Sequence, residues 1–288
     1  MRYTSLFSCI RDSLRVLFGL AMTYSFGVAP AWAQQPLRNI AFYYGAAPDV
    51  KSLQQFQFAV LEPDSGFVPA AARDKKTQWI AYISVGEVAS SRSYYSAIPK
   101  SWVIGHNAEW HSEVIDQSAP GWPKFFVDNV VAPLWKKGYR GFFLDTLDSY
   151  QLVVKSDEQR EQARKGLVAV IRAIHRRFPT AVLILNRGFE LLPAVHNDIY
   201  AVAFESLFKG WSEANGKYID VPSDARVWLL AQVNNVTTKY KLPVIAIDYC
   251  PPEDLQCSRD TVRRIGELNL IPYVGDGRLQ TLSPIILE

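Results

Sequence analysis

Acidic residues stand at or just beyond the ends of several short apolar segments of this chain. Asp145 directly follows residues 141–144 (GFFL), and Glu205 directly follows residues 200–204 (YAVAF). The other acids in comparable positions are Glu62, Glu87, Asp248 and Asp276. Removing a carboxylate from water is costly, so several such positions together favour a functional use. Two carboxyl groups across one bond, one ionised and one protonated, are the groups that glycoside hydrolysis needs.

Aromatic and amide side chains accompany these acids. Tyr43 and Tyr44 end the first apolar segment, Asn186 ends the fifth, and Tyr249 lies directly after Asp248. Sugar rings present C–H faces that stack on aromatic rings, so this composition suits a saccharide groove. Packing in the core or in loops is the alternative role for each aromatic residue.

Other kinds of catalysis lack their motifs. The four histidines form no H-E-x-x-H motif, there is no G-x-S-x-G, and no G-x-G-x-x-G follows the first apolar segment. We therefore expect no metal and no cofactor. The net charge of +3 also indicates no nucleic-acid partner.

Eight short β-rich segments must position these residues. Nearly continuous apolar strands are typical of a parallel sheet buried on both faces. Helices are predicted between them over residues 124–137, after the capping-box sequence of residues 156–159, and over residues 223–241 and 258–268. This alternation predicts an α/β fold, a (β/α)8 TIM barrel whose active site lies at the carboxyl ends of the strands. An open doubly wound sheet is the alternative. The segment from Val88 to Trp122 is predicted to be an elaborated loop after strand 3. The eight strands are predicted at residues 40–44, 58–61, 79–84, 141–144, 182–185, 200–204, 244–247 and 270–274.

The first 33 residues have the features of a cleaved signal peptide. Arg2, Arg11 and Arg15 precede a short apolar stretch, and Ala31-Trp32-Ala33 provides the small residues of a cleavage site. We therefore predict one hydrolase domain over residues 34–288, located in the periplasm or secreted, with no stable membrane insertion after cleavage. In such an oxidising compartment, Cys250 and Cys257 are expected to form a disulfide.

Four segments together resemble the barrel hydrolases of glycoside hydrolase family 114 and the related Pel polysaccharide hydrolase domains of family 166. They are residues 41–45 (AFYYG), 81–87 (AYISVGE), 141–148 (GFFLDTLD) and 204–206 (FES). The resemblance covers nearly all of the chain beyond residue 33. It implies endo-hydrolysis of α-1,4-linked galactosamine or N-acetylgalactosamine polysaccharide.

The resemblance also implies roles for individual residues. Asp145 and Glu205 would be the essential carboxylates of a retaining mechanism, with Asp145 as nucleophile and Glu205 as acid and base. The residues expected to bind substrate are Tyr43, Tyr44, Glu87, Asp148, Asn186, Asp248 and Tyr249.

Two other functions stay open. The chain could be a catalytically silent barrel that binds polysaccharide during exopolysaccharide export, or an enzyme for another α-linked glycan. The polysaccharide export machinery is a possible partner. Pel proteins continue into further domains, including a metal-dependent deacetylase. Since this chain could be a stand-alone hydrolase or the front of a longer protein, the resemblance implies no deacetylation here.

Overall fold

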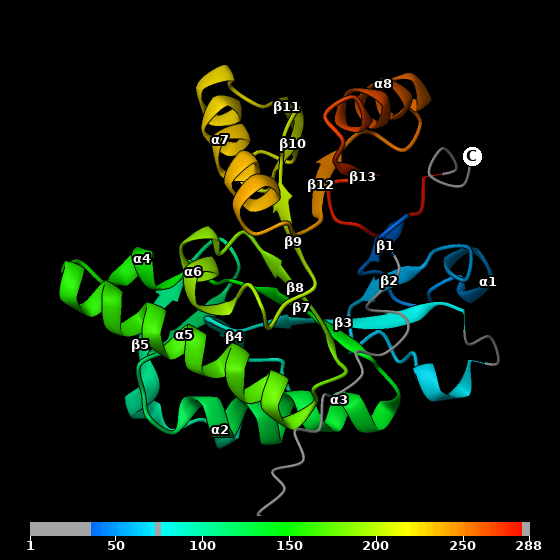
Figure 1. Ribbon diagram of the computed structural model, residues 1–288. Coiled ribbons are helices and arrows are strands. Elements are labelled where there is room, and N and C mark those ends of the chain that lie inside the picture. The colour runs from blue at the N-terminus through cyan, green and yellow to red at the C-terminus, as the bar shows by residue number, and fades with distance from the viewer. Residues whose placement is uncertain (1–35, 73–75, 284–288) are drawn as a thin grey trace, which may run out of the picture.

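The computed structural model describes residues 36–72 and 76–283, and its centre is an eight-stranded parallel sheet that curls into a nearly closed barrel (Figure 1). The first and last strands meet, because the Tyr273 hydroxyl donates to the carbonyl of Phe42 and the N–H of Tyr44 donates to the carbonyl of Leu279. This closure confirms the (β/α)8 barrel and excludes the open sheet. In spatial order the strands are β1 (Ile40–Tyr43), β2 (Phe58–Leu61), β3 (Gln78–Ser84), β7 (Gly141–Asp145), β8 (Val182–Asn186), β9 (Ala201–Glu205), β12 (Val244–Tyr249) and β13 (Ile271–Gly275).

The strands are apolar because both of their faces are covered. All four residues of β2 and all six of β12 are buried. The barrel interior contains large rings, including Phe42, Phe143 and Tyr273, which pack edge-on or tilted with centroids 5.1 and 5.2 Å apart. Burial on both faces explains why these segments show no polar alternation in the sequence.

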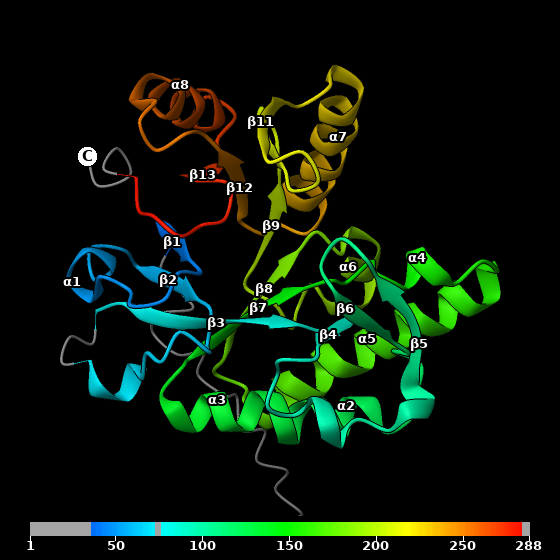
Figure 2. The ribbon, with the colours of Figure 1, turned by 180° about the vertical axis from the view of Figure 1, so that it is seen from behind.

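Helices cover the outside of the barrel unevenly (Figures 1 and 2). The connections after β1 and β2 contain only α1 (Val50–Leu53) and the 3₁₀ turn η2 (Pro69–Ala71). The N-cap predicted at Ser156 is confirmed, since its side chain accepts from the N–H of Gln159. The remaining helical elements are α2 (Trp122–Phe126), the π-helical turn η5 (Val127–Val131), α3 (Ala132–Lys137), α4 (Tyr150–Val153), α5 (Asp157–Arg177), η6 (Phe189–Leu191), α6 (Leu192–Val195), α7 (Ser223–Lys239) and α8 (Leu255–Gly266).

The helix predicted over residues 124–137 forms, but a π-helical turn interrupts it between α2 and α3. Pro133 stands in the first turn of α3 and has no N–H to donate. The regular hydrogen-bond ladder therefore cannot continue unchanged through this point, which is where a π turn is tolerated.

Two small antiparallel sheets lie at the mouth of the barrel. The segment after β3, predicted as an elaborated loop, folds into a three-stranded sheet of β4 (Glu87–Ala89), β6 (Ser112–Ile115) and β5 (Val103–Asn107), with 3₁₀ turns η3 (Tyr95–Ala97) and η4 (Lys100–Trp102). After β9, a hairpin of β10 (Lys209–Ser212) and β11 (Lys217–Asp220) precedes α7. This hairpin was not predicted from the sequence.

The predicted disulfide between Cys250 and Cys257 is formed and joins the end of β12 to α8. Within the described residues, no helix combines the length and the apolar character needed to cross a membrane. The predicted signal peptide lies outside the described residues.

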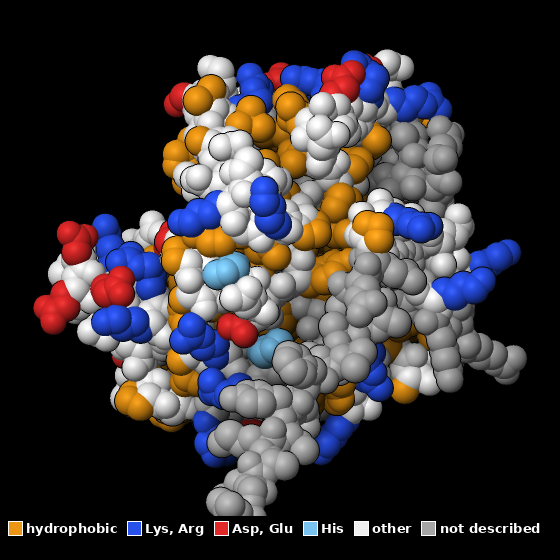
Figure 3. All heavy atoms as spheres, in the orientation of Figure 1, with side chains coloured by type: hydrophobic (Ala, Val, Ile, Leu, Met, Phe, Trp, Pro, Cys, Tyr) orange, Lys and Arg blue, Asp and Glu red, His pale blue; other side chains and the backbone are white. Residues whose placement is uncertain are grey.

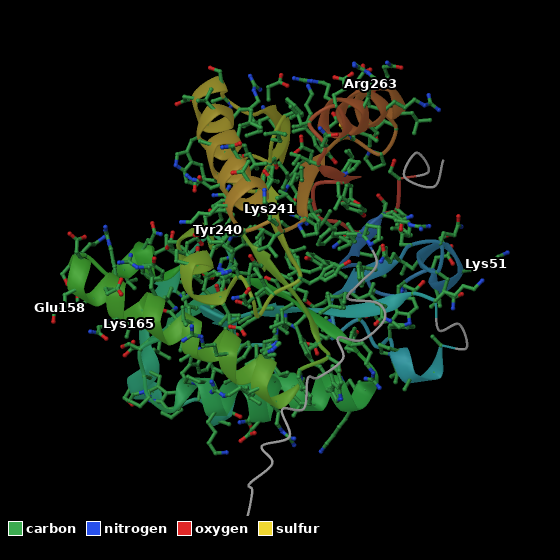
Figure 4. All side chains as sticks on the ribbon, viewed as in Figure 1. Lys51, Glu158, Lys165, Tyr240, Lys241 and Arg263 are labelled. Carbon is green, nitrogen blue, oxygen red and sulfur yellow. A yellow bond between two sulfur atoms is a disulfide. The ribbon has the colours of Figure 1, made fainter. Side chains whose placement is uncertain are left out.

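Charged side chains are scattered over the face shown in Figure 3, and some apolar side chains are visible over α7. Exposed charges such as Lys51 on α1, Glu158 on α5 and Arg263 on α8 point away from the barrel strands (Figure 4).

Candidate active site

Asp145 and Glu205 end β7 and β9, which flank β8 in the barrel sheet. Asn186 ends β8 and lies between them. Its side-chain nitrogen Nδ2 donates to Oδ1 of Asp145 at 2.8 Å and to Oε1 of Glu205 at 3.1 Å. The structure thus brings the two predicted catalytic acids together, because three neighbouring parallel strands end at the same edge.

Two tyrosines hold the other oxygen of each acid. The hydroxyl of Tyr82, on β3, donates to Oδ2 of Asp145 at 2.7 Å. The hydroxyl of Tyr249, at the end of β12, donates to Oε2 of Glu205. Every carboxylate oxygen of the pair therefore has a hydrogen-bond donor, which fixes both side chains before any substrate arrives.

Burial raises the pKa of both carboxyl groups. For Glu205, the neighbouring charge of Asp145 raises the pKa further, while the hydrogen bonds from Tyr249 and Asn186 act in the opposite direction. Burial also raises the pKa of the Tyr82 and Tyr249 hydroxyls well above the usual value. Both hydroxyls therefore stay protonated and act as donors at neutral pH.

The backbone turns sharply after two of these strands. Thr146 and Arg187 directly follow Asp145 and Asn186, and both have left-handed backbones, with φ of 59° and 55°. This conformation is rare for a β-branched residue such as threonine. The Thr146 hydroxyl offsets the strain, because it accepts from the N–H of Gly86 at 2.8 Å and donates to the carbonyl of Asp145 at 2.7 Å.

The backbone of Glu205 is also held in place. Its peptide bond to Ser206 is cis. The guanidinium group of Arg187 donates to the carbonyl oxygen of Glu205. The strand-end turn after Asn186 therefore directly supports the neighbouring acid.

Glu87, predicted to bind substrate, begins β4 and is 4% exposed. Its carboxylate accepts from Nδ2 of Asn107 at 3.0 Å and from the hydroxyls of Ser149 and Ser112. These donors come from β5, the turn after β7, and β6, so Glu87 ties the inserted sheet to the barrel. It also lines the cavity above Asp145 and Glu205.

The main cavity has a volume of about 430 Å³ and is lined by Tyr44, Tyr82 and Tyr249 together with both acids. An adjoining cavity is lined by Asp148 and Asn186, and the exposed ring of Trp110 borders both. Five acidic side chains and two guanidinium groups line the main cavity. The acids are Glu62, Glu87, Asp145, Glu205 and Glu213, and the guanidinium groups belong to Arg92 and Arg278.

Two predicted substrate-binding residues lie elsewhere. Tyr43 does not line these cavities, and its hydroxyl lies 3.5 Å from the carbonyl of Ala46. Asp248 is fully buried, and its carboxylate accepts from the backbone N–H groups of residues 207, 208 and 209 at 2.6 to 2.8 Å. Asp248 therefore does not contact substrate as predicted; instead, its carboxylate supports the loop that follows Glu205.

Four further residues of the site were not predicted from the sequence: Tyr82, Arg92, Glu213 and Arg278. Tyr82 lies inside an apolar strand, where a tyrosine also fits the core. Arg92 pairs with Glu62 through two contacts of 2.5 and 2.9 Å, and Arg278 pairs with Glu213 at 2.6 Å. These loop residues follow no periodic pattern. Among the residues that the structure describes, no three His, Cys, Asp or Glu side chains are arranged as metal ligands.

Comparisons with known proteins find similar glycoside hydrolases. The glycoside hydrolase domain of PelA from Pseudomonas aeruginosa is 35% identical with a TM-score of 0.77, covering 85% of this chain and 96% of that one. A variant of that domain matches at 34% identity, with the same TM-score and the same coverage. Ega3 from Aspergillus fumigatus, solved in complex with galactosamine, shares the fold at 14% identity and a TM-score of 0.61, covering 89% of this chain and 96% of Ega3. The comparison with curated proteins returned no match.

The profile of glycoside-hydrolase family GH114 matches residues 23–286. This match spans most of the chain and confirms the resemblance predicted from its motifs. The chain therefore belongs to glycoside hydrolase family GH114.

Proposed function

We propose that this glycoside hydrolase cleaves internal α-1,4 linkages of a Pel-type galactosamine and N-acetylgalactosamine polysaccharide with retention of anomeric configuration. The main support is the double hydrogen bond of Asn186. Since one nitrogen lies 2.8 Å from Asp145 Oδ1 and 3.1 Å from Glu205 Oε1, these oxygens are less than about 6 Å apart. Retaining enzymes hold their carboxyl groups roughly 5–5.5 Å apart, whereas inverting enzymes need about 6.5–9.5 Å.

We assign Asp145 as the nucleophile and Glu205 as the acid, as the family resemblance implies. Burial raises the pKa of both carboxyl groups, and the charge of one acid disfavours ionisation of the other, so the pair holds a single proton, which we assign to Glu205. Asp145 then attacks the anomeric carbon while Glu205 donates its proton to the departing glycosidic oxygen. In the second half-reaction Glu205 takes a proton from water, and that water releases the sugar from Asp145. Two inversions at one carbon restore the original configuration.

The charge of the main cavity suits an amino-sugar polymer. Its five carboxylates outnumber its two guanidinium groups, and both of these are paired with acids of the same rim. A partly deacetylated galactosamine chain is cationic, so the field at the mouth attracts it. Galactosamine is also the sugar bound to Ega3 in its crystal structure.

The decisive test uses Asp145→Asn and Glu205→Gln on partly deacetylated α-1,4-galactosamine polymer. We expect each variant to lower the release of reducing ends by about a thousandfold or more, because each removes a group that acts in the transition state. Glu158→Gln, at the exposed outer end of α5 (Figure 4), is the matched control and keeps wild-type activity. Full activity of both active-site variants would refute the assignment. NMR of the first anomeric proton formed distinguishes retention from inversion.

The site of action is part of the proposal. We expect the enzyme to act in the periplasm or outside the cell, alongside the exopolysaccharide export machinery. The signal peptide predicted at residues 1–33 supports this, and so does the Cys250–Cys257 disulfide, which an oxidising compartment favours. Fractionation of cells that produce the full chain tests this location, and a strictly cytoplasmic protein would contradict it.

A further inference from the structure

A third cavity, of about 340 Å³, adjoins the catalytic pair on one side only. It shares Glu205 and Tyr249 with the main cavity, but Asp145 does not line it. A retaining enzyme places its nucleophile beneath the sugar that becomes covalently bound, and its acid beside the departing oxygen. A pocket bordered by the acid alone therefore corresponds to the sugar on the leaving-group side.

The walls of this cavity are apolar and come from β10, β11 and the N-terminal half of α7. Trp211 is fixed by donating its Nε1–H to Glu213 at 2.7 Å and by packing on Tyr218. Trp228 packs edge-on against Phe189 with centroids 5.9 Å apart, and yet it is 51% exposed. Ile219 faces the same cavity and is 45% exposed.

The charge of this cavity differs from that of the main one. Its only carboxylate is Glu205, which carries the proton before cleavage in the proposed mechanism, and its only cation is Arg187. A free ammonium group would find no ionised partner here and would face a guanidinium group. An acetamido group is neutral, and its methyl group can pack against apolar walls such as Ile219 and Val221.

We propose that this cavity binds the sugar immediately beyond the scissile bond and selects it in the N-acetylated form. The inference rests on the proposed function. It assigns opposite preferences to the two sides of the cut: the acidic main cavity favours free amines, and the cavity walled by Trp228 and Ile219 favours an acetamido group. In a randomly deacetylated polymer the enzyme therefore cuts the linkage on the non-reducing side of N-acetylgalactosamine residues.

Product analysis tests this directly, because the leaving-group sugar becomes the new non-reducing end. The substrate is an α-1,4-galactosamine polymer of known average acetylation, and the products are sequenced by tandem mass spectrometry. We expect N-acetylated non-reducing ends to exceed the polymer average. Ile219→Glu adds a carboxylate to the wall and shifts the ratio of acetylated to free-amine ends towards the amine by about two- to fivefold, the range of an exposed ion pair.

Val227→Glu is the matched control, since Val227 adjoins Trp228 on α7, is 68% exposed and does not line the cavity. It should leave the ratio at the wild-type value. New non-reducing ends that match the polymer average in the wild type would overturn the inference, and so would equal ratios in the two glutamate variants. A wild-type enzyme that releases no product would instead refute the proposed function itself.

Discussion

The hydrogen bond from Tyr249 to Glu205 provides a sharp test of the catalytic roles. This bond lowers the pKa of Glu205 against the opposing effect of burial, so Tyr249→Phe must raise that pKa. A hydrogen bond to an ionised group contributes about 1.5–3 kcal/mol, and roughly half of it persists with the protonated acid. Since one pH unit corresponds to about 1.4 kcal/mol, we expect a displacement of about one pH unit.

The pH dependence of kcat/KM shows which role the displaced group has. If Glu205 is the acid, activity on galactosamine oligosaccharides is lost at high pH as Glu205 ionises, and Tyr249→Phe moves only this alkaline limb upward. Tyr82→Phe is the companion variant, because Tyr82 donates to Asp145 and lowers its pKa. It should move the acid limb upward, where Asp145 must lose its proton to act as nucleophile.

The outcome that would refute this reasoning is equally specific. If Tyr249→Phe moved the acid limb and Tyr82→Phe moved the alkaline limb, Glu205 would be the nucleophile and the assigned roles would be reversed. If neither limb moved, the hydrogen bonds to the two carboxylates would not control their titration. Circular dichroism of both variants verifies that the fold is intact.

Three further predictions concern stability and support. Because folding raises the pKa of Glu205, its ionisation destabilises the fold as the pH rises. We therefore expect Glu205→Gln to raise Tm at pH 8 and to leave it unchanged at pH 3.5, as measured by calorimetry. Asp248→Asn replaces a carboxylate oxygen that accepts from backbone N–H groups by an NH2 group, which can only donate. We therefore expect a lower Tm and a larger effect on kcat than on KM. Wild-type kinetics of this variant would contradict the role of Asp248 in supporting the loop after Glu205. Reduction of the Cys250–Cys257 disulfide should lower the free energy of unfolding by about 2 kcal/mol in urea titrations, and an unchanged midpoint would count against it.

The barrel was predictable because burial on both faces leaves a strong sequence signal. The eight apolar segments correspond to the eight barrel strands, with ends that differ by at most two residues. The convergence of Asp145 and Glu205 followed from the same reasoning, since the ends of parallel strands share one edge. Asn186 was also placed correctly at this edge, although its double hydrogen bond was not predictable from the sequence.

Two of the predicted substrate-binding residues lie away from the cavities for a common physical reason. Successive side chains on a strand point to opposite sides, so neighbours at a strand end have different surroundings. Tyr44 and Tyr249 reach the main cavity, whereas Tyr43 and Asp248 do not line it. The sequence pattern of a doubly buried strand has no alternation, and so it cannot show which neighbour faces the mouth.

The inserted segments were harder for a different reason. In the sheet after β3, β4 has only three residues and β5 has no fully buried residue, and the hairpin of β10 and β11 consists of two strands of four residues. Short, partly exposed strands bury little apolar surface, so they leave no clear periodicity. Their positions depend on tertiary contacts such as those of Glu87 with Asn107 and Ser112.

The amide of Asn186 carries no charge at any pH at which the protein is folded. A lysine or arginine in its place would pull the proton off both neighbours and would hold them ionised together. The amide instead donates one hydrogen towards each acid and is indifferent to which of the two is ionised. The spacing of the acids can therefore stay the same while a proton leaves Glu205 and later returns, and a single rigid frame serves both halves of a two-step displacement.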